Sequence, residues 1–212
     1  MRAIAPFAER FSRPIGAVVA DLESYAQLLI KWQKVQNLVS RETLSNLWMR
    51  HFADSLQVLR YVSGSDVHFL DLGSGGGFPA LPLAIALKGS QAQFVLVEPN
   101  GRKVSFLRAV ARELGLAVTV EGRRSDEIDS RETPVPDVIT SRALAALPLL
   151  NGMAAPFFGP QTRAIFHKGR EHVEELAESD AYWLYDVLIH KSEIDPDGVL
   201  LELSNLRLKS GN

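Results

Sequence analysis

Hydrophobic and polar residues follow two different periods along this chain, and the periods alternate. Short apolar runs predict strands near residues 67–72, 93–98, 117–121, 136–141 and 162–168. Amphipathic stretches between and after them predict helices near residues 79–88, 101–114, 145–155 and 171–179. Strands that alternate with helices in this way form a parallel sheet covered on both faces, so the sequence predicts an α/β fold.

The two ends of the chain depart from this alternation. Tyr182 to Lys191 and Val199 to Leu208 are apolar-rich runs on either side of the turn sequence Asp-Pro-Asp-Gly, so we expect a C-terminal antiparallel hairpin. Helical periodicity over residues 15–39 and 44–62 predicts two N-terminal helices. We therefore expect an N-terminal helical extension, 1–65, and one compact domain, 66–212.

Three polar residues of the second predicted helix share one face. His51, Asp54 and Ser55 are three and four residues apart, which brings their side chains together on a helix. One interpretation is a His–Asp pair that fixes the helix against the sheet. The other is a polar face that lines a cofactor pocket.

Composition narrows the class of protein. The 212 residues are 46% hydrophobic and 23% charged, as in an ordinary globular protein, and the absence of cysteine excludes disulfides and thiolate zinc sites. No apolar run approaches the length that spans a membrane, and no secretory pattern is seen, so we expect a cytoplasmic protein without a metal site. A net charge of −2 argues against binding nucleic acid by bulk charge alone.

The first strand is followed by a glycine loop. Asp71, Gly73, Gly75 and Gly77 form the pattern D-x-G-x-G-x-G, which is typical of S-adenosylmethionine-dependent methyltransferases. Glycines allow a ligand to approach the backbone closely between a strand and a helix. The dinucleotide pattern G-x-G-x-x-A is also formally satisfied, by Gly75, Gly77 and Ala80, and a nicotinamide-binding oxidoreductase stays an alternative.

Two carboxylates, Asp71 and Glu98, lie at predicted strand ends and match polar groups of S-adenosylmethionine. Asp71 suits the ammonium group of S-adenosylmethionine better than it suits a phosphate. Glu98 ends the next apolar run about twenty residues later, where this kind of fold presents a carboxylate to ribose hydroxyls.

With these residues placed, the chain resembles the bacterial 16S ribosomal RNA guanine-N7 methyltransferase family, also called glucose-inhibited division protein B or ribosomal small subunit methyltransferase G. The resemblance covers nearly the whole length. It depends on motifs including RHFADSL at 50–56, DLGSGGGFPALPLAIA at 71–86, RSDEI at 124–128 and ITSRAL at 139–144.

The resemblance implies a class I, Rossmann-like methyltransferase fold with a mostly parallel seven-stranded sheet. It also implies S-adenosyl-L-methionine as cofactor and 16S ribosomal RNA or the small ribosomal subunit as partner. Cofactor contacts carried over from the family fall on Gly73, Phe78, Ser125, Asp126 and Arg142; Asp71, Gly75, Gly77 and Glu98 join them on chemical grounds. We expect a monomer, because no exposed apolar stripe requires a partner.

The implied reaction needs no general base. Guanine N7 has a free lone pair at neutral pH, so no proton has to leave before it attacks the sulfonium methyl group. Arg142 and Arg124 are the candidate catalytic-site residues, and we place them on RNA phosphates or on the cofactor carboxylate. A methyltransferase of another substrate and a non-catalytic ribosome-associated protein remain alternatives.

Overall fold

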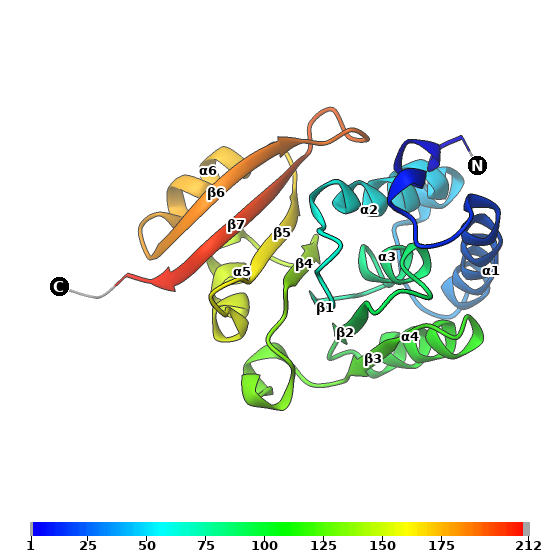
Figure 1. The fold of residues 1–212 in the computed structure, drawn as a ribbon, viewed down its shortest axis with the longest axis horizontal. Coiled ribbons are helices and arrows are strands. Elements are labelled where there is room, and N and C mark those ends of the chain that lie inside the picture. The colour runs from blue at the N-terminus through cyan, green and yellow to red at the C-terminus, as the bar shows by residue number, and fades with distance from the viewer. Residues whose placement is uncertain (1, 210–212) are drawn as a thin grey trace.

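Seven strands form one mixed sheet in the centre of the protein, in a computed structural model that describes residues 2–209 (Figure 1). The strands are β1 His68–Leu72, β2 Gln93–Val97, β3 Val118–Glu121, β4 Val138–Arg142, β5 Arg163–Lys168, β6 Trp183–Lys191 and β7 Val199–Leu208. Their order is β3-β2-β1-β4-β5-β7-β6; β1 to β5 are parallel, and β7 is antiparallel to both β5 and β6. The predicted fold class, with its seven strands and its terminal hairpin, is confirmed.

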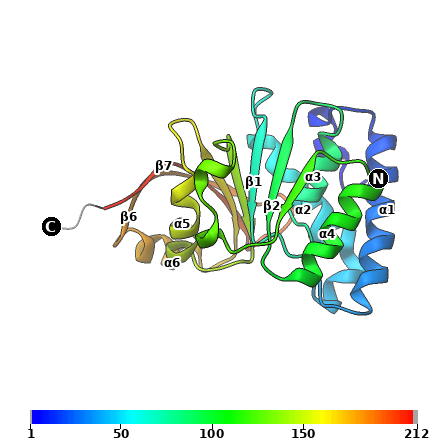
Figure 2. The ribbon, with the colours of Figure 1, turned by 90° about the horizontal axis from the view of Figure 1, so that it is seen from below.

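Helices cover both faces of the sheet (Figure 2). The α-helices are α1 Ile15–Gln33, α2 Asp54–Leu56, α3 Ala80–Ala86, α4 Gly101–Glu113, α5 Leu147–Ala154 and α6 His172–Ser179. The 3-10 helices are η1 Ala5–Arg10, η2 Arg41–Asn46, η4 Gln57–Tyr61, η5 Ser125–Glu127, η6 Ser130–Glu132 and η7 Ala155–Phe157, and η3 Trp48–Ala53 is a π-helix. The predicted helix after residue 100 begins where expected, because the Asn100 side chain accepts hydrogen bonds from the backbone N–H groups of Arg102 and Lys103.

Alternate residues of the strands pack into two separate cores. Phe69 of β1 and Val138 of β4 face a core built with the N-terminal helices, α3 and α4. Their neighbours Leu70 and Ile139 face a second core built with α5 and η7. Successive side chains of a strand point to opposite faces, so the continuous apolar runs of the sequence supply both cores.

The first helix is shorter than its periodicity predicts. α1 ends at Gln33 and not near residue 39, because the Gln33 side chain forms hydrogen bonds with backbone groups of the segment that would continue the helix. Its Oε1 accepts from the N–H groups of Leu38 and Val39 at 2.8 and 3.1 Å, and its Nε2 donates to the Val39 carbonyl at 2.7 Å. The loop that follows is held against the glycine turn, with the Leu38 carbonyl facing Gly76.

The second predicted helix, 44–62, is wrong as a continuous α-helix. The segment consists of η2, η3, α2 and η4 in succession, with one short α-helical piece. The π-turns of η3 carry His51 and Phe52 inward, where both are buried. The Ser55 hydroxyl donates to the His51 carbonyl at 2.6 Å, so it bonds within the segment.

The hairpin turn between β6 and β7 contacts the N-terminal segment. Gln57 donates from Nε2 to the Ser192 hydroxyl at 3.2 Å and accepts from the Glu193 N–H at 3.0 Å. Arg50 forms an ion pair with Asp195 at 3.2 Å. Segments far apart in the sequence therefore form one wall beside the carboxyl ends of the strands.

Candidate functional site

The glycine loop between β1 and α3 adopts a backbone that favours glycine. Gly73, Gly75 and Gly77 all have positive φ angles, of 68°, 57° and 96°. Beside Gly75 there is open space, since a Cβ atom there would meet nothing nearer than the Gly73 carbonyl at 3.7 Å. Gly77 faces inward instead, and a Cβ atom there would lie 2.9 Å from the Tyr25 hydroxyl. Gly75 is thus open to a ligand, whereas Gly77 permits close packing of the loop on α1.

Glu98 is fixed by the same loop. Its Oε2 accepts from the Gly75 N–H at 2.8 Å, and its Oε1 accepts from the Asn100 N–H at 2.9 Å. The residue is only 5% exposed. Each carboxylate oxygen has lone pairs left after these bonds, so Glu98 is oriented to accept two further hydrogen bonds, as a pair of ribose hydroxyls requires.

Asp71 lies inside β1, beneath the loop. Its Oδ1 accepts from the Thr140 hydroxyl at 2.6 Å, and its Oδ2 has no hydrogen-bond partner among the described residues. Burial raises the pKa of Asp71 to about 7. The residue is 1% exposed and does not line the cavity described below. A direct contact between Asp71 and an ammonium group therefore stays a prediction.

Arg142 is the last residue of β4, and its guanidinium group lies 4.9 Å from the centre of the Phe78 ring. Phe78 directly follows the glycines, so the glycine loop and the carboxyl end of β4 are in contact here. The next residue, Ala143, has a positive φ of 53°, which is strained for a residue with a Cβ atom. This turn places Leu144 against Gly73.

A cavity of about 1390 Å³ opens at the carboxyl ends of the parallel strands. Its first side is formed by the glycine loop and the strand ends, and includes Gly73, Gly75, Phe78, Glu98 and Arg142. The rest is formed by η2, η3, α2, the segment from Glu171 into α6, and the hairpin turn. It includes Thr43, His51, Asp54, Glu171, Glu174, Glu178, Ser192 and Asp195. Ligands of open α/β sheets bind at this edge, because loops from several strands converge there.

The structure does not bring all predicted residues to this cavity. Arg124, Ser125 and Asp126 are absent from its lining, and Arg124 forms an exposed ion pair with Asp126 at 3.0 Å. That hydrogen-bonded pairing raises the pKa of Arg124 and lowers the pKa of Asp126. The predicted roles of these three residues stay predictions.

The interpretation of His51 as one half of a His–Asp pair is wrong, and Lys168 in the cavity lining also forms internal contacts. His51 does not pair directly with Asp54; Arg142 lies between them and contacts both. Lys168, the last residue of β5, has a side chain that is 7% exposed and that donates to Glu175 and to the Ala145 carbonyl, both at 2.6 Å. The lysine is therefore held in an internal ion pair.

Sequence reasoning missed the contribution of the hairpin turn and of α6 to the cavity. Ser192, Ile194 and Asp195 come from a turn that reads only as a connection. The acidic residues of α6 can be read from the sequence, but the position of this helix beside the cavity depends on the order of the strands in the sheet. No local pattern reveals that order.

The residues present fit S-adenosylmethionine. The open backbone at Gly75 gives the close approach that a cofactor needs, and Glu98 presents oriented acceptors. Arg142 is a cation beside the loop, suited to a carboxylate. Among residues 2–209, no cluster of three or more His, Asp or Glu side chains could hold a metal ion. In the same part of the chain, no helix is both long and apolar enough to cross a bilayer.

The fold is similar to that of solved methyltransferases and related proteins. One is the cofactor-bound protein Rv0187 from MTB, with a TM-score of 0.59 and 14% identity over 87% of this chain and 89% of that chain. At this identity the similarity shows the fold alone.

Sequence comparison identifies the family. "Ribosomal RNA small subunit methyltransferase G" of Bartonella quintana (strain Toulouse) is 42% identical over 188 residues, 88% of this chain and 86% of that protein. The protein of the same name from Chelativorans sp. (strain BNC1) is 39% identical over 208 residues, 94% of this chain and 98% of that protein. The family model for rRNA small subunit methyltransferase G (GidB) matches residues 18–194. The chain belongs to the rRNA small subunit methyltransferase G family, as the sequence motifs predicted.

Proposed function

We propose that this protein transfers a methyl group from S-adenosyl-L-methionine to N7 of a guanine in 16S ribosomal RNA. The observation that supports it most directly is the cavity beside the glycine loop. Its volume of about 1390 Å³ exceeds the roughly 300–1000 Å³ of a pocket for one small ligand. The cavity therefore has room for a cofactor beside Glu98 and for a base on the side of η3 and the hairpin turn.

The side chains of the cavity suit a reaction that needs alignment and no proton transfer. S-adenosylmethionine supplies an electrophilic methyl group when bound. N7 has its own lone pair, so the protein must hold the base in line with that methyl group, and such positioning lowers a barrier by about 7 kcal/mol or more. A guanine that enters the cavity must first leave its stack, which favours an unpaired or flipped nucleotide.

The charges around the cavity favour the product. Guanine gains positive charge as N7 is methylated, and the cavity lining includes Glu174 and Glu178 of α6 and Glu171, which directly precedes this helix. Their negative potential favours that charge, whereas a free arginine beside the ring would oppose it. Arg142 also lines the cavity, but its positive charge is balanced by the ion pair with Asp54 at 2.9 Å.

The residues outside the cavity keep their proposed roles under one condition. Asp126 reaches an adenine amino group, together with Ser125, only after its ion pair with Arg124 opens. The two side chains are 66% and 61% exposed, and opening such a surface pair costs about 0–1 kcal/mol. Arg124 is then available to an RNA phosphate.

The proposed partner is 16S ribosomal RNA or the small ribosomal subunit, and the place of action is the cytoplasm. We also propose a monomer, as expected from the sequence. We retain residues 1–65 as the helical extension and 66–212 as the methyltransferase domain; residue 1 and residues 210–212 lie outside the described part. The extension supplies part of the cavity wall through Thr43 and His51.

The proposal is tested by mapping N7-methylguanine in small-subunit RNA from cells with and without this gene. We expect one modified guanine to disappear with the gene. The purified protein should then restore it on small subunits and show no turnover on free guanosine. Turnover on a small molecule or a protein, with no change in the RNA, contradicts the proposal. An intact cofactor site without transfer to any ribosomal substrate contradicts it as well.

A further inference from the structure

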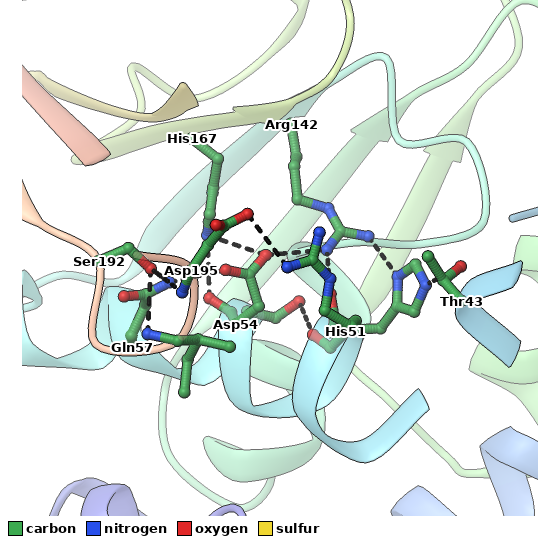
Figure 3. A network of polar contacts seen from close by, with 11 residues as sticks. Thr43, His51, Asp54, Gln57, Arg142, His167, Ser192 and Asp195 are labelled. Carbon is green, nitrogen blue, oxygen red and sulfur yellow. Dashed lines mark hydrogen bonds and ion pairs between the residues drawn. The ribbon is translucent and has the colours of Figure 1, made fainter. Parts of the chain in front are cut away.

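Arg142 is held by three residues of the N-terminal segment, and two of them, His51 and Asp54, are labelled in Figure 3. Its Nη1 donates to Asp54 Oδ2 at 2.9 Å and to the Arg50 carbonyl at 3.0 Å. Its Nη2 lies 2.7 Å from His51 Nδ1. β4 and the η3–α2 segment, about ninety residues apart in sequence, are joined through this one guanidinium group.

The hydrogen bonds fix the state of His51. A guanidinium group can only donate, so Nδ1 of His51 must accept. The ring proton is then on Nε2, which donates to the Thr43 hydroxyl at 2.8 Å. Burial, with the nearby Arg142 charge as the next cause, lowers the pKa of His51 to about 4, so the ring is neutral near pH 7. His51 is a neutral acceptor of fixed orientation.

Asp54 is fixed in a similar way. Its side chain is 14% exposed, with Oδ2 on Arg142, and its Oδ1 accepts from Gln57 Nε2 at 2.8 Å. The Phe78 ring completes the enclosure, 4.9 Å from the Arg142 guanidinium carbon and 4.7 Å from the His51 ring. Arg142 is therefore constrained by an anion, a neutral acceptor and an aromatic face.

Part of Arg142 remains unused. Of its five N–H donors, three are spent on Asp54, Arg50 and His51. The Nε–H and one Nη2–H have no partner among residues 2–209. The side chain is 17% exposed and lines the cavity beside Phe78.

We infer that His51 and Asp54 are positioning residues, which aim the two remaining donors of Arg142 at the carboxylate of the cofactor's methionyl group. This inference rests on the proposed function and concerns the cofactor half of the cavity. A carboxylate is favoured over an RNA phosphate because Arg142 is mostly buried and lies against the residue that follows the glycine loop. A backbone phosphate approaches exposed cations more readily than one enclosed by protein. Two donors on one planar group match the two oxygens of a carboxylate.

Two substitutions of His51 separate positioning from packing. The amide oxygen of asparagine lies near the place of Nδ1, so His51→Asn keeps an acceptor for Arg142. The amide of glutamine reaches the place of Nε2, so His51→Gln keeps the contact with Thr43 and loses the one with Arg142. Asp54→Asn removes the charge that holds Nη1. His190→Gln is the matched control, because His190 pairs with Glu202 outside the cavity.

The test is titration calorimetry with two probes on each folded variant. S-adenosylhomocysteine has the carboxylate, and 5′-methylthioadenosine lacks the whole amino acid portion. We expect His51→Gln and Asp54→Asn to bind S-adenosylhomocysteine roughly 10- to 100-fold more weakly, as the loss of a charge-assisted contact predicts. Their affinity for methylthioadenosine should stay within about twofold of wild type. His51→Asn should recover most of the affinity for S-adenosylhomocysteine.

Three outcomes overturn the inference. Equal losses for both probes show that the two residues only support the pocket. Unchanged affinity for S-adenosylhomocysteine, with weaker binding of small-subunit RNA in a filter assay, assigns Arg142 to a phosphate. Equal affinities of His51→Asn and His51→Gln for S-adenosylhomocysteine show that Nδ1 has no positioning role. The comparison of these two variants is sufficient if Asp54→Asn does not fold. Failure of the wild type to bind either probe refutes the proposed cofactor site itself, so the two failures are distinguishable.

Discussion

The N–H of Gly75 donates to Oε2 of Glu98 at 2.8 Å, so the glycine loop after β1 and the carboxylate after β2 form one unit. The bond explains why these two sequence features occur together. Glu98 shapes the loop from the neighbouring strand, and the loop in turn orients the carboxylate. A ligand at this edge meets both at once.

Glu98→Gln should weaken cofactor binding by roughly 10- to 100-fold, since a charge-assisted acceptor becomes a neutral amide. Calorimetry with S-adenosylhomocysteine measures the change. The matched control is Glu121→Gln, at the end of β3, where the carboxylate pairs with Arg123 outside the cavity. Equal effects of the two substitutions argue against a ribose contact at Glu98.

Gly77→Ala should destabilise the protein more than Gly89→Ala. Both glycines have φ angles above 90°, so an alanine at either position costs about 1 kcal/mol of backbone strain. A Cβ atom at Gly77 also overlaps Leu81 and Tyr25, whereas nothing lies within 4 Å at Gly89. Overpacking adds about 1–3 kcal/mol at Gly77. Urea unfolding of both variants measures the difference, and equal free energies of unfolding contradict the packing role.

Asp71 should make the protein less stable as the pH rises from about 4 to about 7. Burial raises its folded-state pKa to about 7 from 3.8, so the folded state keeps a proton that the unfolded state has released over this interval. The stabilisation is complete below the unfolded pKa and is lost as the pH passes the folded pKa. Asp71→Asn should remove this component. Unfolding of both proteins at several pH values checks it, and a difference in stability that does not vary with pH refutes the assignment.

Lys168→Met should affect stability before it affects RNA binding. Lys168 and Glu175 form a mostly buried pair, and Glu175 also accepts from the Leu147 N–H at 2.6 Å, at the start of α5. Loss of the cation should cost about 3 kcal/mol, the lower end of the range for a buried pair, because the Glu175 side chain is 19% exposed. Lys191→Met, at an exposed position, should cost less than about 0.5 kcal/mol. Weaker RNA binding by Lys168→Met at unchanged stability contradicts this account.

Much of the fold was predictable because its signals are local. The strands from β1 to β5 and the helices α3 to α6 all lie close to their predicted ranges. The turn residues Asp195 to Gly198 predicted the hairpin between β6 and β7. Each of these features depends on residues within a few positions of one another.

The site was less predictable because its contacts are distant in sequence. The position of Arg142 depends on His51, and the two are separated by the whole of β1, β2 and β3. The π-turns of η3 and the side chain of Gln33 override helical periodicity through contacts that no period reveals. The strand order, which buries Asp71 beneath the loop, is likewise a property of the assembled sheet.

The contact of the hairpin turn with Arg50 and Gln57 has a consequence for biosynthesis. Arg50 is synthesised long before Asp195. A nascent chain that extends only to the end of β5 therefore contains the glycine loop but lacks the wall of the cavity that the hairpin turn forms. The proposed position of the base, on the side of the hairpin turn, should therefore be enclosed only after translation has passed the hairpin. We therefore expect the complete cavity to form only when synthesis of the chain is nearly finished.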